Sequence, residues 1–278
     1  PNRKLYRPMT LFSRILLGIL TVGIFPAAGE PTVITPTAAP PNPQDYRRIA
    51  YPWKKNITAT VFWIGEKPTP RNPTPNHASS WDTQWQRNYG GYDTPDKSAR
   101  IQYRPKAFTP KLNPFYIALP YNDCLNHKEH CKHASRVIPW WQRRADKRPG
   151  KSSCKGRWLQ IVYGKKVCYA QWEDCGPFTT DDWPYVFGNQ RPKNTKNKAA
   201  GLDVSPAVRD YLGMPSKAKV HWRFVDFASI PKGPWAQYGT NNPFLHTQLD
   251  PRRKALQEYM DHLRKLRDQA YAQENNRR

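Results

Sequence analysis

One continuous stretch, residues 157–213, limits what this chain can fold into, because its turn and cap residues stand at defined positions. Arg157–Tyr163 and Lys166–Glu173 are rich in β-branched and aromatic residues, and only Gly164 and Lys165 separate them. A glycine that opens a two-residue loop is typical of a type II′ turn, so the two segments are predicted to form a β-hairpin. The stretch therefore indicates a β-rich fold.

A corner and a short helix follow the hairpin. Gly176-Pro177 ends the second strand, because proline has no N–H to donate to a neighbouring strand. Ser205 is a good N-cap and Gly213 a good stop, so a short helix is predicted between them. Asp174 is thereby placed at a strand end, and Asp203 in a buried acidic turn just before the helix.

The motifs E-D-C-G-P-F (173–178) and L-D-V-S-P-A-V-x-x-Y-L-G (202–213) resemble the second half of a six-stranded double-psi β-barrel. They are similar to those of the rare lipoprotein A group, whose barrel also occurs in expansins, family-45 endoglucanases and barwin-like proteins. Cys175 stands where that group has an arginine. The resemblance implies a mainly β fold: the barrel with long loop insertions and a short helix after Asp203. Apolar residues at three- and four-residue spacing near the end of the chain add an amphipathic C-terminal helix to this prediction.

The resemblance also implies catalytic candidates. Asp203 matches the position of the catalytic acid, and Asp174 at the corner is its possible partner. In the endoglucanases a catalytic base follows an aromatic pair in the first strand; here Ile64 stands there and Glu66 lies two residues further on. A histidine that assists catalysis in the rare lipoprotein A relatives falls near Tyr116, which is a poor base near neutral pH.

Each of these assignments has a structural alternative. A helix N-terminus favours the ionised form of Asp203, and only burial would raise its pKa. Asp174 would in that case tie the corner by accepting backbone amides. The aromatic side chains also admit two interpretations, either as core or as flat faces for sugar rings; the candidates for sugar binding are Trp63, Trp172, Trp183 and Tyr185.

Residues 1–29 are interpreted as a secretion signal, with a basic start, an apolar run at Ile15–Phe25 and small residues before cleavage near Gly29. The alternative is a membrane anchor, but the apolar run is well short of the roughly 20 residues that a spanning helix needs. The expected location is therefore secreted or periplasmic, with no membrane span after cleavage.

The rest of the chain divides into three parts. Residues 30–56 form a proline-rich linker, 57–240 the barrel domain, and 241–278 a connector and helix. Further strands are predicted at Ile57–Ile64, Phe115–Pro120 and Val220–Phe227, and the C-terminal helix at Arg252–Gln273.

Residues 123–133 concentrate two cysteines and three histidines. Thiolate and imidazole ligands suit zinc or copper, but in an exported protein a disulfide between Cys124 and Cys131 is favoured. If the hairpin register continued, Cys154 would face Cys175, although pairing of Cys154 with Cys168 stays open. The sequence thus predicts disulfides, no metal and no cofactor.

The chain carries a formal net charge of +24. Outside the cytoplasm, this charge favours a cell-wall glycan or another anionic wall polymer as partner. Nucleic acid is a weaker candidate, since the basic residues are scattered and no recognised binding motif occurs. Two functions follow as hypotheses: cleavage of a peptidoglycan-like polysaccharide in the manner of a lytic transglycosylase, or binding without catalysis, as in expansins and barwin-like proteins.

Overall fold

The computed structural model describes residues 51–70, 72–125, 129–143 and 148–246, together with positions 262 and 266. The predicted signal peptide, most of the predicted linker and most of the predicted C-terminal helix lie outside these residues. Within the described residues, no helix has the length and apolar character needed to cross a membrane.

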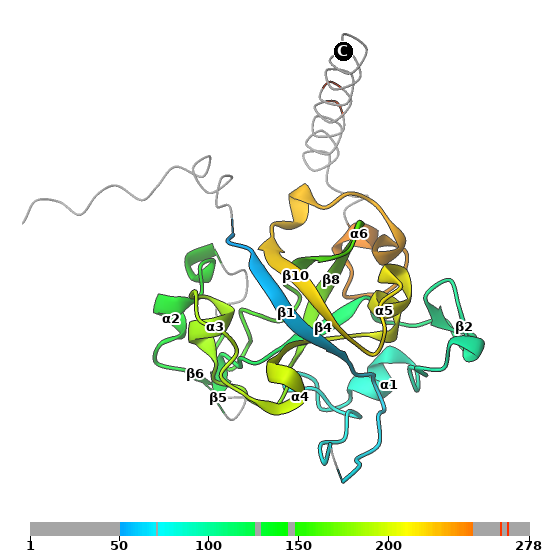
Figure 1. Cartoon of the computed structure of the whole chain (residues 1–278), viewed down its shortest axis with the longest axis horizontal. Coiled ribbons are helices and arrows are strands. Elements are labelled where there is room, and N and C mark those ends of the chain that lie inside the picture. Colours follow the sequence, from blue (N-terminus) through cyan, green and yellow to red (C-terminus); the bar gives the residue numbers. More distant parts are fainter. Residues whose placement is uncertain are drawn as a thin grey trace, which may run out of the picture. The chain divides into compact units, whose positions relative to one another are not determined.

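Six strands close into a barrel in the order β1-β10-β7-β8-β4-β9 (Figure 1), which confirms the predicted closed six-stranded barrel. Their bounds are Lys54–Val61 (β1), Tyr116–Leu119 (β4), Trp158–Tyr163 (β7), Lys166–Cys175 (β8), Ala200–Val204 (β9) and Lys217–Val225 (β10). Two of the pairings, β1 with β9 and β4 with β8, are parallel, and the other four are antiparallel. The barrel is therefore mixed, and its closure leaves these strands no free edge.

Short elements fill the long connections around the barrel (Figure 1). Two small hairpins are formed by β2 with β3 and by β5 with β6; these strands are Arg100–Ile101, Arg104–Pro105, Cys124–Leu125 and Glu129–His130. The α-helices are Trp85–Tyr89 (α1), Ala134–Val137 (α2), Trp183–Val186 (α3), Lys196–Ala199 (α4), Pro206–Leu212 (α5) and Pro243–His246 (α6). The 3₁₀ turns are Lys97–Ala99 (η2), Trp141–Arg143 (η3), Phe227–Ser229 (η4) and Pro234–Ala236 (η5).

The hairpin and the helix form as predicted. Strands β7 and β8 pair antiparallel up to the turn, where Gly164 has a φ of 56° that suits the first position of a type II′ turn. Ser205 caps the start of helix α5, its hydroxyl accepting a hydrogen bond from Val208 N–H, and Gly213 follows the helix with a φ of 69°. The Gly176-Pro177 corner follows the end of β8 and has a cis peptide bond.

The residues around Asp203 differ from the prediction. They form strand β9 where the sequence predicted a turn, because β1 pairs with them on one side and β4 on the other. Leu202 and Val204 point into the core from this strand and are fully buried. A five-residue strand held between two neighbours has too short a pattern to distinguish it from a turn.

The apolar interior has two parts. The larger cluster draws side chains from every barrel strand, among them Ile57, Ile117, Trp172, Val204 and Trp222. The smaller cluster contains Phe62, Ile64, Trp85, Tyr89, Tyr116 and Ala118, and so joins the insertion after β1 to β4. Strand β4 thus contributes alternate residues to the two clusters, as expected of a strand covered on both faces.

The predicted disulfides are not formed, since all five cysteines are thiols. The thiol of Cys124 donates to the carbonyl of Gly150 and that of Cys131 to the carbonyl of Asn122, so the two side chains contact different carbonyls. Cys175 likewise donates to a backbone carbonyl, that of Tyr121, at 3.1 Å. The β7–β8 pairing begins at Trp158, so the predicted hairpin register does not reach Cys154.

Candidate functional site

The barrel brings Asp174 and Asp203 to the two sides of one residue, Ala118 of β4. Ala118 pairs with Asp174 of β8 in parallel and with Asp203 of β9 in antiparallel orientation. Neighbouring strands lie about 4.8 Å apart, so the two aspartate backbones are at most about 10 Å from each other. Residues far apart in the sequence, from the corner and from the helix motif, therefore share one site.

Strands β8 and β9 each carry a bulge close to their aspartate, and the one in β8 aligns Asp174 with Ala118. Between β4 and β8 the register shifts after Ile117, and Glu173 is the extra residue that precedes Asp174. Between β1 and β9 the register shifts after Thr58, and Gly201 is the extra residue two positions before Asp203. Bulges change which face a following side chain occupies, and here each lies beside a candidate carboxylate.

Asp203 has the environment expected of a proton donor. It is partly exposed, and its Oδ1 accepts a hydrogen bond from the hydroxyl of Thr60 on β1. Its Oδ2 lies toward Gly176, where an added Cβ would stand 3.9 Å away. Burial, together with the nearby charges of Glu66 and Asp174, raises the pKa of Asp203 to about 7, against the opposing effect of the Thr60 hydrogen bond.

Asp174 is more tightly held. It is 8% exposed, and its Oδ1 accepts from the backbone N–H groups of Ser80 and Cys175, each at 2.8 Å. Burial raises the pKa of Asp174 to about 6, although these hydrogen bonds favour the ionised form. The contact with Ser80 also ties the insertion after β1 to the corner, so Asp174 has a structural role whatever its chemistry.

Glu66 is the third carboxylate of this group. It follows β1 and accepts a hydrogen bond from Asn76 Nδ2 at 2.9 Å, and burial raises its pKa. Its charge acts on Asp203, so the two carboxylates lie within electrostatic reach of each other. The structure thus brings together three of the four predicted catalytic residues, Asp203, Asp174 and Glu66.

The fourth, Tyr116, lies in a separate buried network. Its hydroxyl donates to Asp93 Oδ2 at 2.7 Å and accepts from Ile64 N–H at 3.0 Å, and the residue is 1% exposed. Asp93 is also fully buried and pairs with Arg100 at 2.5 Å. These partners satisfy the hydroxyl and favour a structural role for Tyr116, joining β4 to the insertion.

The four predicted sugar-binding aromatics are not equivalent. Trp172 and Tyr185 are fully buried in the core, which does not fit the predicted stacking of their rings on a sugar. Trp63 is half-buried and lies close to Glu66, whose N–H donates to the Trp63 carbonyl. Trp183 is 39% exposed and packs its ring beside that of His133.

Three residues beside the site were not predicted as functional. Thr60 contacts Asp203 only because β1 and β9 pair in parallel, which nothing local in the sequence signals. Phe178 follows the corner and is 43% exposed, with the Lys196 ammonium 5.4 Å from its ring centroid. Glu173 is 2% exposed, and burial raises its pKa to about 7. Phe178 and Glu173 both belong to the motif at 173–178, but the sequence does not show that Phe178 is exposed and Glu173 buried.

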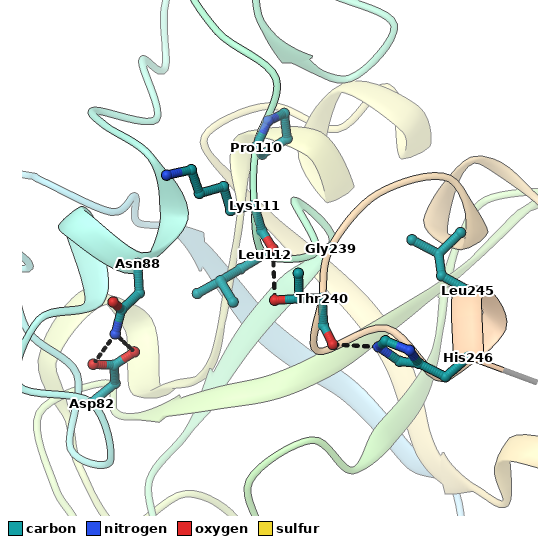
Figure 2. A pocket seen from close by; sticks show the side chains of 9 residues that line it. All are labelled: Asp82, Asn88, Pro110, Lys111, Leu112, Gly239, Thr240, Leu245 and His246. Carbon is teal, nitrogen blue, oxygen red and sulfur yellow. Dashed lines mark hydrogen bonds between the residues drawn. The ribbon is translucent and has the colours of Figure 1, made fainter.

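A cavity of about 480 Å³ lies elsewhere, between α1, the segment before β4 and α6 (Figure 2). Both oxygens of Asp82 accept from Asn88, and His246 Nε2 is within 2.6 Å of the Thr240 carbonyl. Neither Asp174 nor Asp203 lines it. The carboxylate of Asp82 and the imidazole of His246 are already engaged in these contacts. The aspartate pair is therefore the stronger candidate for a catalytic site, although it does not line this cavity.

The sequence was compared with protein-family models and with curated proteins. A scan against protein-family models finds no match, and a search of curated proteins finds no similar sequence. The closed six-stranded mixed barrel and the two aspartates beside Ala118 are therefore the observations from which a function is argued.

Proposed function

We propose that this protein cleaves a cell-wall polysaccharide of the peptidoglycan type, with Asp203 as the acid/base. The observation that carries the proposal is Asp203 itself, a partly exposed carboxyl group whose pKa of about 7 keeps it largely protonated in mildly acidic solution. Export to the wall, predicted from residues 1–29, belongs to the same proposal.

Cleavage of the glycosidic bond requires an acid that protonates the glycosidic oxygen. Oδ1 of Asp203 accepts the Thr60 hydroxyl, so Oδ2, on the side of Gly176, carries the transferable proton. In a lytic transglycosylase the proton breaks the glycosidic bond, and a hydroxyl of the substrate attacks and returns its proton to the same carboxylate. One acid/base therefore suffices; burial keeps the Asp203 pKa raised, and the negative charges of Glu66 and Asp174 add to this effect.

We assign the barrel to the double-psi type within this proposal. Support comes from the two parallel pairs, β1 with β9 and β4 with β8, set among antiparallel neighbours in one closed barrel. The corner 173–178 and the helix motif 202–213 supply the side chains of the site in the same order as in the rare lipoprotein A group. Exposed Phe178 offers a ring face beside the corner on which a sugar can stack.

The test compares three proteins on purified peptidoglycan: the full chain, Asp203→Asn and Asp181→Asn. Asp181 is an exposed aspartate paired with Lys193, and serves as the matched control. The wild type and Asp181→Asn are expected to release soluble fragments with anhydro ends, detected by mass spectrometry. Asp203→Asn is expected to be slower by about 10²- to 10⁴-fold, the usual contribution of a general acid.

Equal release by wild type and Asp203→Asn contradicts the assignment of Asp203. Circular dichroism of each variant separates lost chemistry from lost folding. Because Asn keeps the size and one oxygen of Asp203, the Thr60 hydrogen bond can persist in that variant.

A second function, binding without cleavage, is favoured by the hydrogen bonds of Asp174. Its Oδ1 accepts hydrogen bonds from two backbone N–H groups, and these bonds are enough to explain a purely structural role for this aspartate. In this case the full chain and Asp203→Asn sediment equally with insoluble peptidoglycan, and neither releases fragments.

A further inference from the structure

The segment around β5 and β6 gathers a carboxylate, a thiol and an imidazole away from the aspartate pair. Cys124 and His130 are directly opposite partners in this small antiparallel hairpin, so their side chains lie on the same face. Asp123 precedes Cys124 and is fully buried. One ligand atom from each of the three residues lies within 4.8 Å of the other two.

The separations are close to those of a coordination sphere. Cys124 Sγ is 3.7 Å from Asp123 Oδ1, and His130 Nε2 is 4.0 Å from Asp123 Oδ2. Zinc bonds of 2.0–2.3 Å in a tetrahedron place neighbouring ligand atoms about 3.3–3.8 Å apart. The two distances go to different oxygens of Asp123, and single ligand atoms of the three residues lie within 4.8 Å of one another. Side-chain movements of about 1 Å therefore bring three ligand atoms around one ion.

The surroundings hold two of these side chains in place. Asp123 accepts from the hydroxyl of Ser152 and from the N–H of Ser153, each at 2.6 Å. The His130 ring packs edge-on against Trp141, with centroids 4.9 Å apart. Such outer contacts orient the first-shell ligands of metal sites. An ion would replace the contact of His130 Nε2 with the Lys151 carbonyl, the neutral ring then carrying its proton on Nδ1, and binding would release the proton of the Cys124 thiol.

We propose that Asp123, Cys124 and His130 form a zinc-binding site. A thiolate, an imidazole and a carboxylate are together the ligands of Zn²⁺, whereas Mg²⁺ and Ca²⁺ take oxygen ligands. Three protein ligands leave a fourth position for water. Because all three residues already contact residues 150–153, the ion would fasten the β5–β6 hairpin to the segment that leads into β7.

The test measures zinc on the full chain purified under reducing conditions. The protein is incubated with zinc chloride, passed over chelating resin, and its metal content is determined by mass spectrometry. About one zinc per chain is expected for the wild type and for the controls Cys168→Ala and His246→Ala, which remove a thiol and an imidazole elsewhere. Cys124→Ala and His130→Ala are each expected to bind at least 10- to 100-fold more weakly, the loss that outer-contact changes alone cause.

A cobalt titration supplies a second measurement. Co²⁺ bound to a thiolate gives a charge-transfer absorption, expected in the wild type and absent from Cys124→Ala. The His130 side chain is 12% exposed and packs against Trp141, so circular dichroism first checks that His130→Ala is folded. Folded His130→Ala then decides the outcome if Cys124→Ala does not fold. The proposal is overturned if the wild type retains no zinc, if His130→Ala retains it fully, or if peptide mapping of the native protein finds Cys124 in a disulfide.

Discussion

Buried carboxyl groups dominate the barrel at the scale of single residues. Glu173 and Asp174 are adjacent on β8, and Asp203 lies on β9. Burial raises the pKa of Glu173 and of Asp203 to about 7 and that of Asp174 to about 6. A group whose pKa is higher in the folded than in the unfolded chain binds protons on folding. Its contribution to stability is present at low pH and is lost as the pH rises through the folded pKa.

Glu173 offers the clearest test of this behaviour. Its Oε1 accepts from Asn241, whereas its Oε2 is buried with no hydrogen-bond partner. We expect Glu173→Gln to remove a loss of stability on the order of 3 kcal/mol between pH 4.5 and pH 7, since one pKa unit corresponds to about 1.4 kcal/mol and its pKa rises from 4.5 to about 7.

The measurement is urea unfolding of wild type, Glu173→Gln and the exposed control Asp181→Asn at pH 5 and pH 8. The free energy of unfolding of Glu173→Gln should fall less between these pH values than that of the wild type. Asp181→Asn should behave as the wild type. An equal fall in all three proteins would mean that Glu173 is ionised in the folded state without cost.

Little of this residue-scale chemistry was predictable. Asp174 and Asp203 can be recognised in the sequence, because Asp174 lies beside the Gly-Pro corner and Asp203 beside the helix cap. The pairing of Asp174 with Ala118 depends on the bulge at Glu173, and that of Asp203 with Thr60 follows the bulge at Gly201; a bulge leaves no pattern in a single sequence. The network of Tyr116 with Asp93 and Arg100 was missed for a related reason, since its members come from β4, from a loop and from β2.

At the scale of elements, helix α5 connects the site to the core. Ser205 is fully buried, and its hydroxyl both accepts from Val208 N–H at 3.3 Å and donates to the Pro114 carbonyl at 2.7 Å. The cap therefore fixes the helix start directly after β9 and beside the start of β4. This helix was predictable, because its cap and stop residues act within one turn of the chain.

Ser205→Ala should lower the free energy of unfolding by about 2–4 kcal/mol, because it removes the cap and leaves a buried carbonyl without its donor. The control is Ser229→Ala, in the exposed turn η4, where the hydroxyl contacts only the Asp226 carbonyl and a change below about 0.5 kcal/mol is expected. Urea unfolding measures the change in each variant, and the slope of the free energy of unfolding against urea concentration should stay the same. Similar values for the two variants would show that α5 is held by its apolar contacts alone.

Prediction of the elements failed where their partners are distant in the sequence. The β7–β8 hairpin carries its turn within itself, so its strands were found to within a residue or two. Strand β9 was missed, since it is defined by β1 and β4 on either side and by no turn of its own. The disulfides were wrongly predicted from spacing, which does not reveal that the thiols face backbone carbonyls.

At the scale of the whole molecule, the net charge of +24 is its most pronounced property. Attraction of such a chain to a polyanion weakens as salt shortens the Debye length, from about 10 Å at 0.1 M to about 3 Å at 1 M. We expect the full chain to be retained on an anionic polysaccharide matrix at 0.1 M sodium chloride and released by about 1 M. A neutral polysaccharide matrix is the control, and retention that ignores salt would mean that charge does not drive binding.

The pairing of β1 with β9 and β10 has a consequence for how the protein is made. The first barrel strand finds its partners only among the last strands of the domain. Ordering the chain between them costs entropy before those contacts repay it. During synthesis one edge of β1 therefore lacks its partner until residue 204 has been made, and the other edge until residue 225. A chain that ends before β10 cannot close this barrel, because β10 is the strand that joins β1 to β7.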